Sequence, residues 1–100
     1  MPFWIEIVPS ARDELKSIKV FYRRIIAEDI ESQLAYEPTV ETKNRKLLVE
    51  ADPSFECEPP VWELRVGDFR VFYDVDESAT TVYVRAVREK PPHVSTEEIL

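Results

Sequence analysis

Arginine and aromatic residues recur on one predicted side of the C-terminal half of this sequence. Counting alternate positions along three predicted strands places seven side chains on the same sheet face: Glu63, Arg65, Arg70, Phe72, Asp74, Tyr83 and Arg85. Guanidinium groups match phosphate oxygens in geometry, and aromatic rings can stack on nucleobases, so the pattern indicates an anion-binding site. Arg88 and Lys90 follow at the end of the last strand. The pattern is equally typical of a solvated sheet with cross-strand Arg–Glu pairs, and the spacing alone leaves both interpretations open.

Other potentially reactive side chains give weaker indications. Cys57 lies in an acidic loop where nothing would lower its pKa, so we do not expect a cysteine nucleophile. His93, next to two prolines, is interpreted as an exposed residue or, alternatively, as a general acid. The basic run 43–46 favours a solvated loop or a phosphate contact, and Ser10 is predicted to cap a helix. One cysteine and one histidine form no metal cluster, and there is no glycine-rich phosphate loop, so no metal or other cofactor is expected.

Three consecutive strands must position the arginine face. Apolar and polar residues alternate over 61–66, 69–75 and 80–88, and the only glycine, Gly67, lies in the first turn, which predicts an antiparallel meander. The opposite, core-facing side is predicted to carry Trp62, Leu64, Val66, Phe69, Val71, Tyr73, Val75, Val82, Val84 and Ala86. We expect helices to cover this side.

The N-terminal part predicts a strand over 3–8 and helical structure from 11 to 36. Apolar residues recur there with the helical period, and Ser10 with Asp13 resembles a capping box. Either one long helix or a helical hairpin broken near 18–21 fits the pattern, because β-branched and aromatic residues weaken the helix there. Residues 47–49 could add a short strand before a proline-rich loop.

The chain has 100 residues and a net charge of −7, which predicts a single acidic domain over 1–100. A nucleic acid would be repelled by the chain as a whole and could bind only at a local basic face. The sequence has no long apolar run and no secretory signal, so no membrane association is expected. With a lone cysteine, the predicted location is the reducing cytoplasm.

The segment from Trp62 to Val75, WELRVGDFRVFYDV, resembles the signature hairpin of the RelE/ParE toxin superfamily of bacterial toxin–antitoxin modules. The usual form is an aromatic residue, a polar residue, Leu-Arg, a short glycine turn, then aromatic-Arg-apolar-apolar-Tyr. The strand before Pro9, the helix that follows, and the Lys/Arg-Leu segment after Pro38 extend the similarity through Lys90. The resemblance implies an α+β fold of order β-α-α-β-β-β, with a helical hairpin on one face of a small antiparallel sheet.

The resemblance also implies a toxin of a type II toxin–antitoxin module. RelE-like members cut mRNA in the ribosomal A site, so the first expectation is a ribosome-dependent, metal-independent endoribonuclease (mRNA interferase) that inhibits translation. The alternatives are a ParE-like inhibitor of DNA gyrase, or a catalytically decayed member that only binds its antitoxin. All three imply a cognate antitoxin, and the acidic toxin favours a partner with a basic or apolar surface.

Site roles follow from the same resemblance. Arg70 matches the arginine that stabilises the phosphate, and Lys90 falls where ribonucleases of the family place an Arg or His. Glu63 stands where the best-known RelE toxins have a lysine, and it would serve as the base. These three residues are the expected catalytic group. The expected RNA-binding residues are Arg65, Arg85, Arg88, Phe72 and Tyr83.

Overall fold

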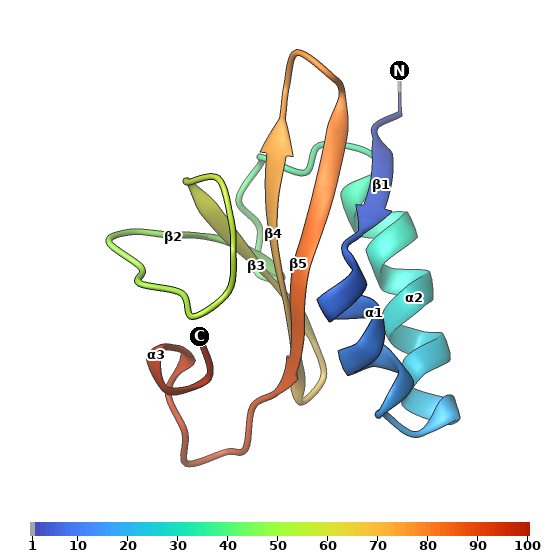
Figure 1. Ribbon diagram of the computed structural model, residues 1–100, viewed down its shortest axis with the longest axis vertical. Coiled ribbons are helices and arrows are strands. Elements are labelled where there is room, and N and C mark those ends of the chain that lie inside the picture. Colours follow the sequence, from blue (N-terminus) through green and yellow to red (C-terminus); the bar gives the residue numbers. More distant parts are fainter. Residues whose placement is uncertain (1) are drawn as a thin grey trace.

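The computed structural model describes residues 2–100 and is built around one five-stranded sheet (Figure 1). The elements in chain order are β1 (Trp4–Ile7), α1 (Pro9–Lys16), α2 (Val20–Leu34), β2 (Arg45–Leu48), β3 (Val61–Val66), β4 (Phe69–Asp76), β5 (Thr81–Glu89) and α3 (Thr96–Ile99). The expected α+β order is confirmed, with two additions. The optional strand around 47–49 does form, as β2, and a short C-terminal helix follows β5.

The strands lie in the order β1-β5-β4-β3-β2. Strands β2 to β5 pair in antiparallel fashion, but β1 pairs with β5 in parallel, with Ile5 opposite Val82. The expectation of a purely antiparallel sheet is therefore wrong at this edge. A tight hairpin forces its two strands to be antiparallel, whereas β1 is joined to the rest of the sheet through two helices and carries no such constraint.

The helical region is a hairpin, which decides between the two alternatives left open by the sequence. Helix α1 ends at Lys16, and the turn closes through the Ile18 amide, which donates to the Leu15 carbonyl at 3.1 Å. The predicted Ser10 cap is wrong, because α1 begins one residue earlier at Pro9, and Val8 occupies the cap without a side-chain hydrogen bond. Proline suits this first position, since it has no N–H that would need an acceptor there.

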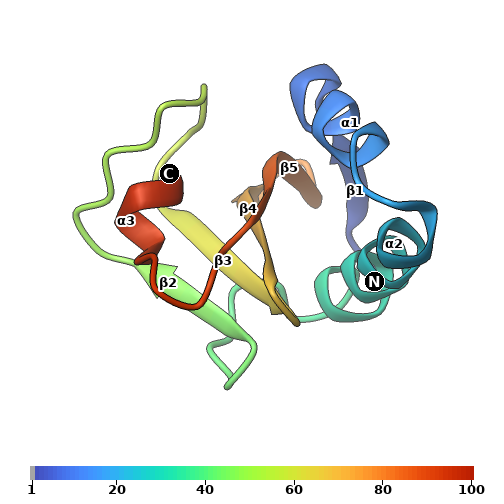
Figure 2. The same cartoon turned by 90° about the horizontal axis from the view of Figure 1, so that it is seen from below.

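The helical hairpin covers one face of the sheet, as expected (Figure 2). Ile26, Ile30 and Leu34 are buried on the inner side of α2, and the burial of each contributes about 1.5–3 kcal/mol. Facing them from the sheet are the buried residues Trp62, Leu64, Val66, Val71, Tyr73, Val82 and Val84. We call this side the helix face.

The opposite side of the sheet, which we call the loop face, is covered as well. Val61, Phe72 and Ala86 are buried there against Phe55, Cys57, Leu48, Ile99 and Leu100. The expectation of an open, solvated face is therefore wrong. The segment 51–58 and the C-terminal segment 91–100 lie over it (Figure 2). Neither covering segment has a repeating hydrophobic pattern, which is why the sequence did not reveal this layer.

Ala86 lies on the loop face although alternation predicts it on the helix face. The pairing shifts between Phe72, opposite Ala86, and Tyr73, opposite Val84, so Arg85 is an extra residue in β5. Such a β-bulge reverses the alternation beyond it. Val87 consequently joins the helix-face core in place of Ala86.

Arg45, part of the predicted basic loop, is instead a buried anchor at the start of β2. Its guanidinium donates to the carbonyls of Val40 and Gln33, at 3.0 and 2.8 Å, and so ties β2 to the end of α2. Tyr73 fastens the same connection, because its hydroxyl donates to the Pro38 carbonyl at 2.6 Å. Among residues 2–100, no helix combines the length and apolar character needed to cross a bilayer.

Candidate functional site

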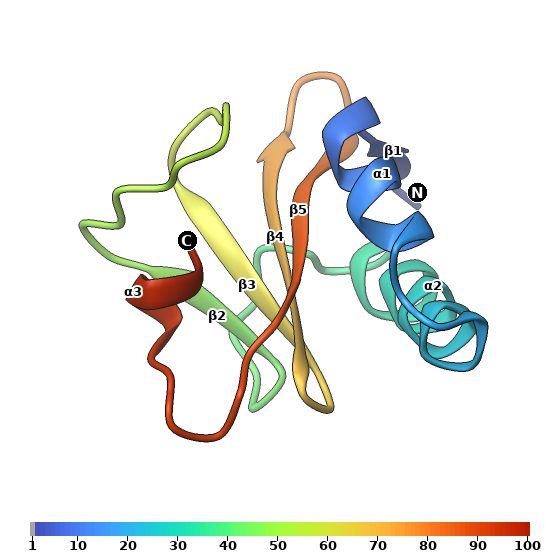
Figure 3. The same ribbon diagram turned by 60° about the horizontal axis from the view of Figure 1, so that its bottom comes forward.

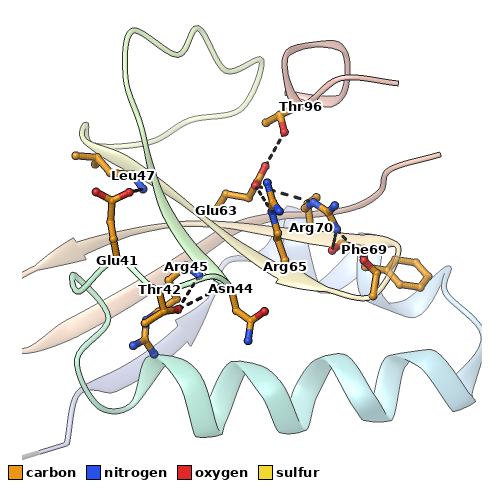
Figure 4. Close-up of polar contacts among 11 residues, drawn as sticks. Glu41, Thr42, Asn44, Arg45, Leu47, Glu63, Arg65, Phe69, Arg70 and Thr96 are labelled. Carbon is orange, nitrogen blue, oxygen red and sulfur yellow. Dashed lines mark hydrogen bonds and ion pairs between the residues drawn. The ribbon is translucent and has the colours of Figure 1, made fainter. Parts of the chain in front are cut away.

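Glu63 is the centre of the candidate site on the loop face (Figure 4). It points to that face from β3, and only 1% of it is exposed. One carboxylate oxygen, Oε2, accepts a hydrogen bond from the Thr96 hydroxyl in α3 at 2.8 Å. The other, Oε1, lies 3.5 Å from Nε of Arg65 and 4.0 Å from Nε of Arg70. A buried carboxylate thus sits between two of the predicted functional arginines.

Arg70 is turned back onto its own hairpin. Its Nη1 donates to the carbonyls of Gly67 and Phe69, both at 2.8 Å, and 13% of its side chain is exposed. Gly67, which carries the first of these acceptors, takes a left-handed conformation with φ of 57°, which a glycine adopts without strain. Nε of Arg70 is buried, and no hydrogen-bond acceptor reaches it within residues 2–100.

Arg65 is the most exposed of the arginines on this face. Its side chain is 49% exposed, and its contact with Glu63 is long for a hydrogen bond. Lys90 lies at the same end of the sheet, because its amide donates to the Asp68 carbonyl in the hairpin turn at 2.7 Å. The fold therefore brings Glu63, Arg65 and Arg70 into one cluster and leads Lys90 to the hairpin beside it.

Arg85 belongs to a separate pair with Asp74. Its Nε and Nη2 donate to the two oxygens of Asp74 at 2.8 and 3.2 Å, and Asp74 also accepts the Glu58 amide at 3.0 Å. Burial acts to lower the pKa of Arg85, but the hydrogen bond and negative charge of Asp74 outweigh it and raise that pKa. The guanidinium also lies over the ring of Tyr83, with 4.9 Å between its Cζ and the ring centroid.

Arg88 forms a third group that joins three parts of the chain. Its Nε donates to the Glu14 carboxylate of α1 at 3.1 Å, and its Nη1 donates to the Ile99 carbonyl at 2.7 Å and to the Ser54 hydroxyl at 3.2 Å. The same guanidinium lies 5.3 Å from the ring centroid of Phe55. Arg88 therefore fastens both covering segments to the sheet.

Phe72 cannot stack on a base in this arrangement. It is fully buried, with its ring 5.7 Å from that of Phe55, so its expected role in RNA binding is corrected to a core role. Tyr83 stays partly exposed, and His93 is exposed in the turn before α3. Burial, followed by the negative charge of Asp74, raises the pKa of the Cys57 thiol, which agrees with the expectation that it is not a nucleophile.

The comparisons with known proteins match this architecture. A sequence profile described as the ParE toxin of type II toxin–antitoxin systems, parDE, matches residues 5–90. The chain belongs to this family. The matched residues include the hairpin that carries Arg70 and both helices that cover the sheet. The sequence comparison with curated proteins gave no match.

Solved structures of RelE toxins share the fold of this ParE-family chain. The RelBE2 toxin–antitoxin complex of Mycobacterium tuberculosis aligns with a TM-score of 0.71 and 22% identity, over 90% of this chain and 93% of that one. The archaeal RelE–RelB complex of Pyrococcus horikoshii gives 0.69 and 22%, over 92% and 99%. The isolated RelE toxin of E. coli gives 0.66 and 13%, over 89% and 85%. At these identities the likeness concerns the fold.

Three residues that hydrogen-bond to the predicted site residues were not identified from the sequence. Glu14, Ser54 and Thr96 lie far along the chain from their partners, and no local pattern marks them. Asp74 is different, because alternation along the predicted strand 69–75 already placed it on the arginine face. Its burial, which makes it a fixed partner of Arg85, depends on the covering segment 51–58 and was not foreseeable.

Proposed function

We propose that this protein is the toxin of a type II toxin–antitoxin pair and that it acts by binding a protein target, DNA gyrase, rather than by cutting mRNA. The observation that carries the proposal is the engagement of the arginines on the loop face. Arg85 is held by both oxygens of Asp74, Arg88 by Glu14, and Arg70 by two backbone carbonyls. The match to the ParE toxin family supports the same mode of action.

RNA cleavage through the 2′-hydroxyl needs a base, an acid and a cation that stabilises the crowded phosphate in the transition state. Groups that do this must be aimed at the substrate before it arrives. Here the guanidinium groups are aimed at the protein's own acceptors, and the buried Glu63 adds a negative charge between Arg65 and Arg70. A phosphate entering the cluster would meet this charge and would have to displace formed hydrogen bonds.

The second candidate is ribosome-dependent mRNA cleavage, and one observation favours it. Arg65 keeps half of its side chain exposed beside Arg70, at the end of the sheet where Lys90 also lies. In this reading Glu63 is the base, Arg70 stabilises the phosphate and Lys90 assists the leaving oxygen. Thr96 would have to release Glu63, which requires the C-terminal segment to move.

One pair of assays on the purified protein separates the two candidates. We expect inhibition of DNA supercoiling by gyrase, and intact transcript ends in a translating extract. Arg70→Ala should leave gyrase inhibition unchanged when near-ultraviolet circular dichroism shows a retained fold. Transcript cleavage that is lost in Arg70→Ala would overturn the proposal in favour of the ribonuclease. Absence of both activities would also overturn it and would leave only antitoxin binding.

The proposed partner that neutralises this toxin is an antitoxin encoded beside it. The support is that two of the structures sharing this fold are toxin–antitoxin complexes. Co-expression with the adjacent gene product should restore growth, and the two proteins should co-purify. If the neighbour neither co-purifies nor restores growth, this part of the proposal is wrong.

A further inference from the structure

The first two turns of helix α2 expose several large apolar side chains to solvent. Figure 3 shows α2 at the outer edge of the molecule, with α1 above it and strands β2 to β5 to its left. Val20, Phe21, Tyr22 and Ile25 are 63%, 66%, 45% and 40% exposed. A helix that only covered a core would carry polar residues at these positions. Phe21 and Ile25 are four residues apart and lie on one side of the helix, whereas Val20 and Tyr22 point to its two flanks. Exposed apolar side chains grouped in this way mark a surface that contacts another molecule.

The charges of α2 run against its own helix dipole. Lys19 is the N-cap, and Arg23 and Arg24 lie in the N-terminal half. Glu28, Asp29 and Glu31 lie in the C-terminal half. The first turn contains no acidic residue and the last turn no basic one. Favourable placement is the reverse, because the N-terminus of a helix carries partial positive charge and the C-terminus partial negative charge. The isolated helix therefore gains nothing from this arrangement.

We infer that the outer face of α2 is a self-association surface that binds a second copy of this chain, with the two α2 helices antiparallel. An antiparallel pairing places the basic half of each helix against the acidic half of the other and also opposes their dipoles. When the pair is centred one residue beyond Ile25, Arg24 faces Glu28 of the second copy, and this contact occurs twice. The two Ile25 side chains then lie near the symmetry axis.

The charge pattern favours a second copy over other occupants. A polyanion would be repelled by the acidic half of α2, and a basic peptide by the basic half, whereas the chain itself complements both. Ile25, at the centre of the proposed contact, is aliphatic and suits helix packing more than base stacking. Helix α2 has 15 residues and is about 22 Å long, so the contact is small and its dimer weak. This inference is independent of the proposed function.

Sedimentation equilibrium of the purified full chain over two decades of concentration tests the inference. We expect a reversible monomer–dimer equilibrium. Arg24→Glu and Glu28→Arg, which each create two like-charge contacts, should weaken dimerisation by at least about tenfold. The double variant Arg24→Glu/Glu28→Arg should restore it, because the pairs are complementary again. Lys43→Glu, the same charge change at an exposed loop position, is the matched control and should have no effect.

A cross-link locates the contact. In a Cys57→Ser background, Ile25→Cys should form a covalent dimer on mild oxidation, since the two side chains would meet across the axis. A wild-type chain that stays monomeric at all concentrations overturns the inference. So does a dimer that Arg24→Glu leaves unchanged and that Ile25→Cys does not cross-link, because its interface would then lie elsewhere.

Discussion

Removing Arg85 should destabilise the fold far more than removing a more exposed arginine on the same face. Arg85→Ala takes away the two donors that neutralise Asp74, which is 2% exposed and then keeps only the Glu58 amide. Breaking a buried ion pair by deleting one partner costs about 3–5 kcal/mol. Because 14% of the Arg85 side chain is exposed, we expect the lower end, about 3 kcal/mol.

Urea unfolding provides the measurement, with Trp62, stacked on Tyr73 in the core, as the fluorescent reporter. With a denaturant slope of about 1–3 kcal/mol per molar urea, the midpoint should fall by roughly 1–3 M. Arg65→Ala is the matched control, because its partly exposed pair with Glu63 is worth less than about 1 kcal/mol.

A double variant tests the physical reason for this loss. Asp74→Asn keeps an oxygen for the Glu58 amide but carries no charge, so Asp74→Asn with Arg85→Met should recover most of the stability. If Arg85→Ala costs no more than Arg65→Ala, Arg85 is not a structural residue. The claim that this arginine is unavailable to a substrate would then be refuted.

Three further predictions concern two buried side chains, Tyr73 and Phe72, and the half-buried Cys57. Tyr73→Phe removes the hydrogen bond to the Pro38 carbonyl and should cost about 1–3 kcal/mol. Burial raises the pKa of Tyr73 above its usual 10.0, so the folded state keeps a proton that the unfolded state loses. The wild-type free energy of unfolding should therefore fall as pH rises beyond 10, and urea titrations of Tyr73→Phe should show less of this decline. Phe72→Ala, at a fully buried position against Phe55, should cost about 3–5 kcal/mol in the same assay, and a loss below about 1 kcal/mol would return Phe72 to the surface. Because the pKa of Cys57 is raised, its thiol should react with iodoacetamide at neutral pH more slowly in the folded than in the urea-unfolded protein, and equal rates would contradict the structure.

The helix face could be predicted from the sequence because local rules determine it. Period-two alternation placed Trp62, Leu64, Val71 and Tyr73 correctly, and the single glycine marked the hairpin turn. Beyond the bulge at Arg85 the same alternation gave the wrong side for Ala86. The sequence does not indicate that β5 contains one additional residue. The predicted alternation therefore fails at the point where the backbone departs from the regular pleat.

The loop face could not be predicted, because long-range contacts decide it. The residues of the expected site were found on a common face, but whether they are open or covered depends on Phe55, Ile99 and Leu100, which lie in irregular segments. The net charge also concealed a local charge pattern. The net charge of −7 for the whole chain does not reveal the opposite charges in the two halves of α2.

The carboxylate partner of each arginine also determines how readily that arginine can bind an anion. An anion that took Arg85 from Asp74 would leave a carboxylate buried without its cation, at a cost of about 3–5 kcal/mol. That cost corresponds to a loss of roughly two to four powers of ten in affinity. Arg65 can bind an anion at little cost in free energy, because its contact with Glu63 is long and its side chain is half exposed. Any phosphate binding on this face should therefore depend on Arg65 and hardly on Arg85.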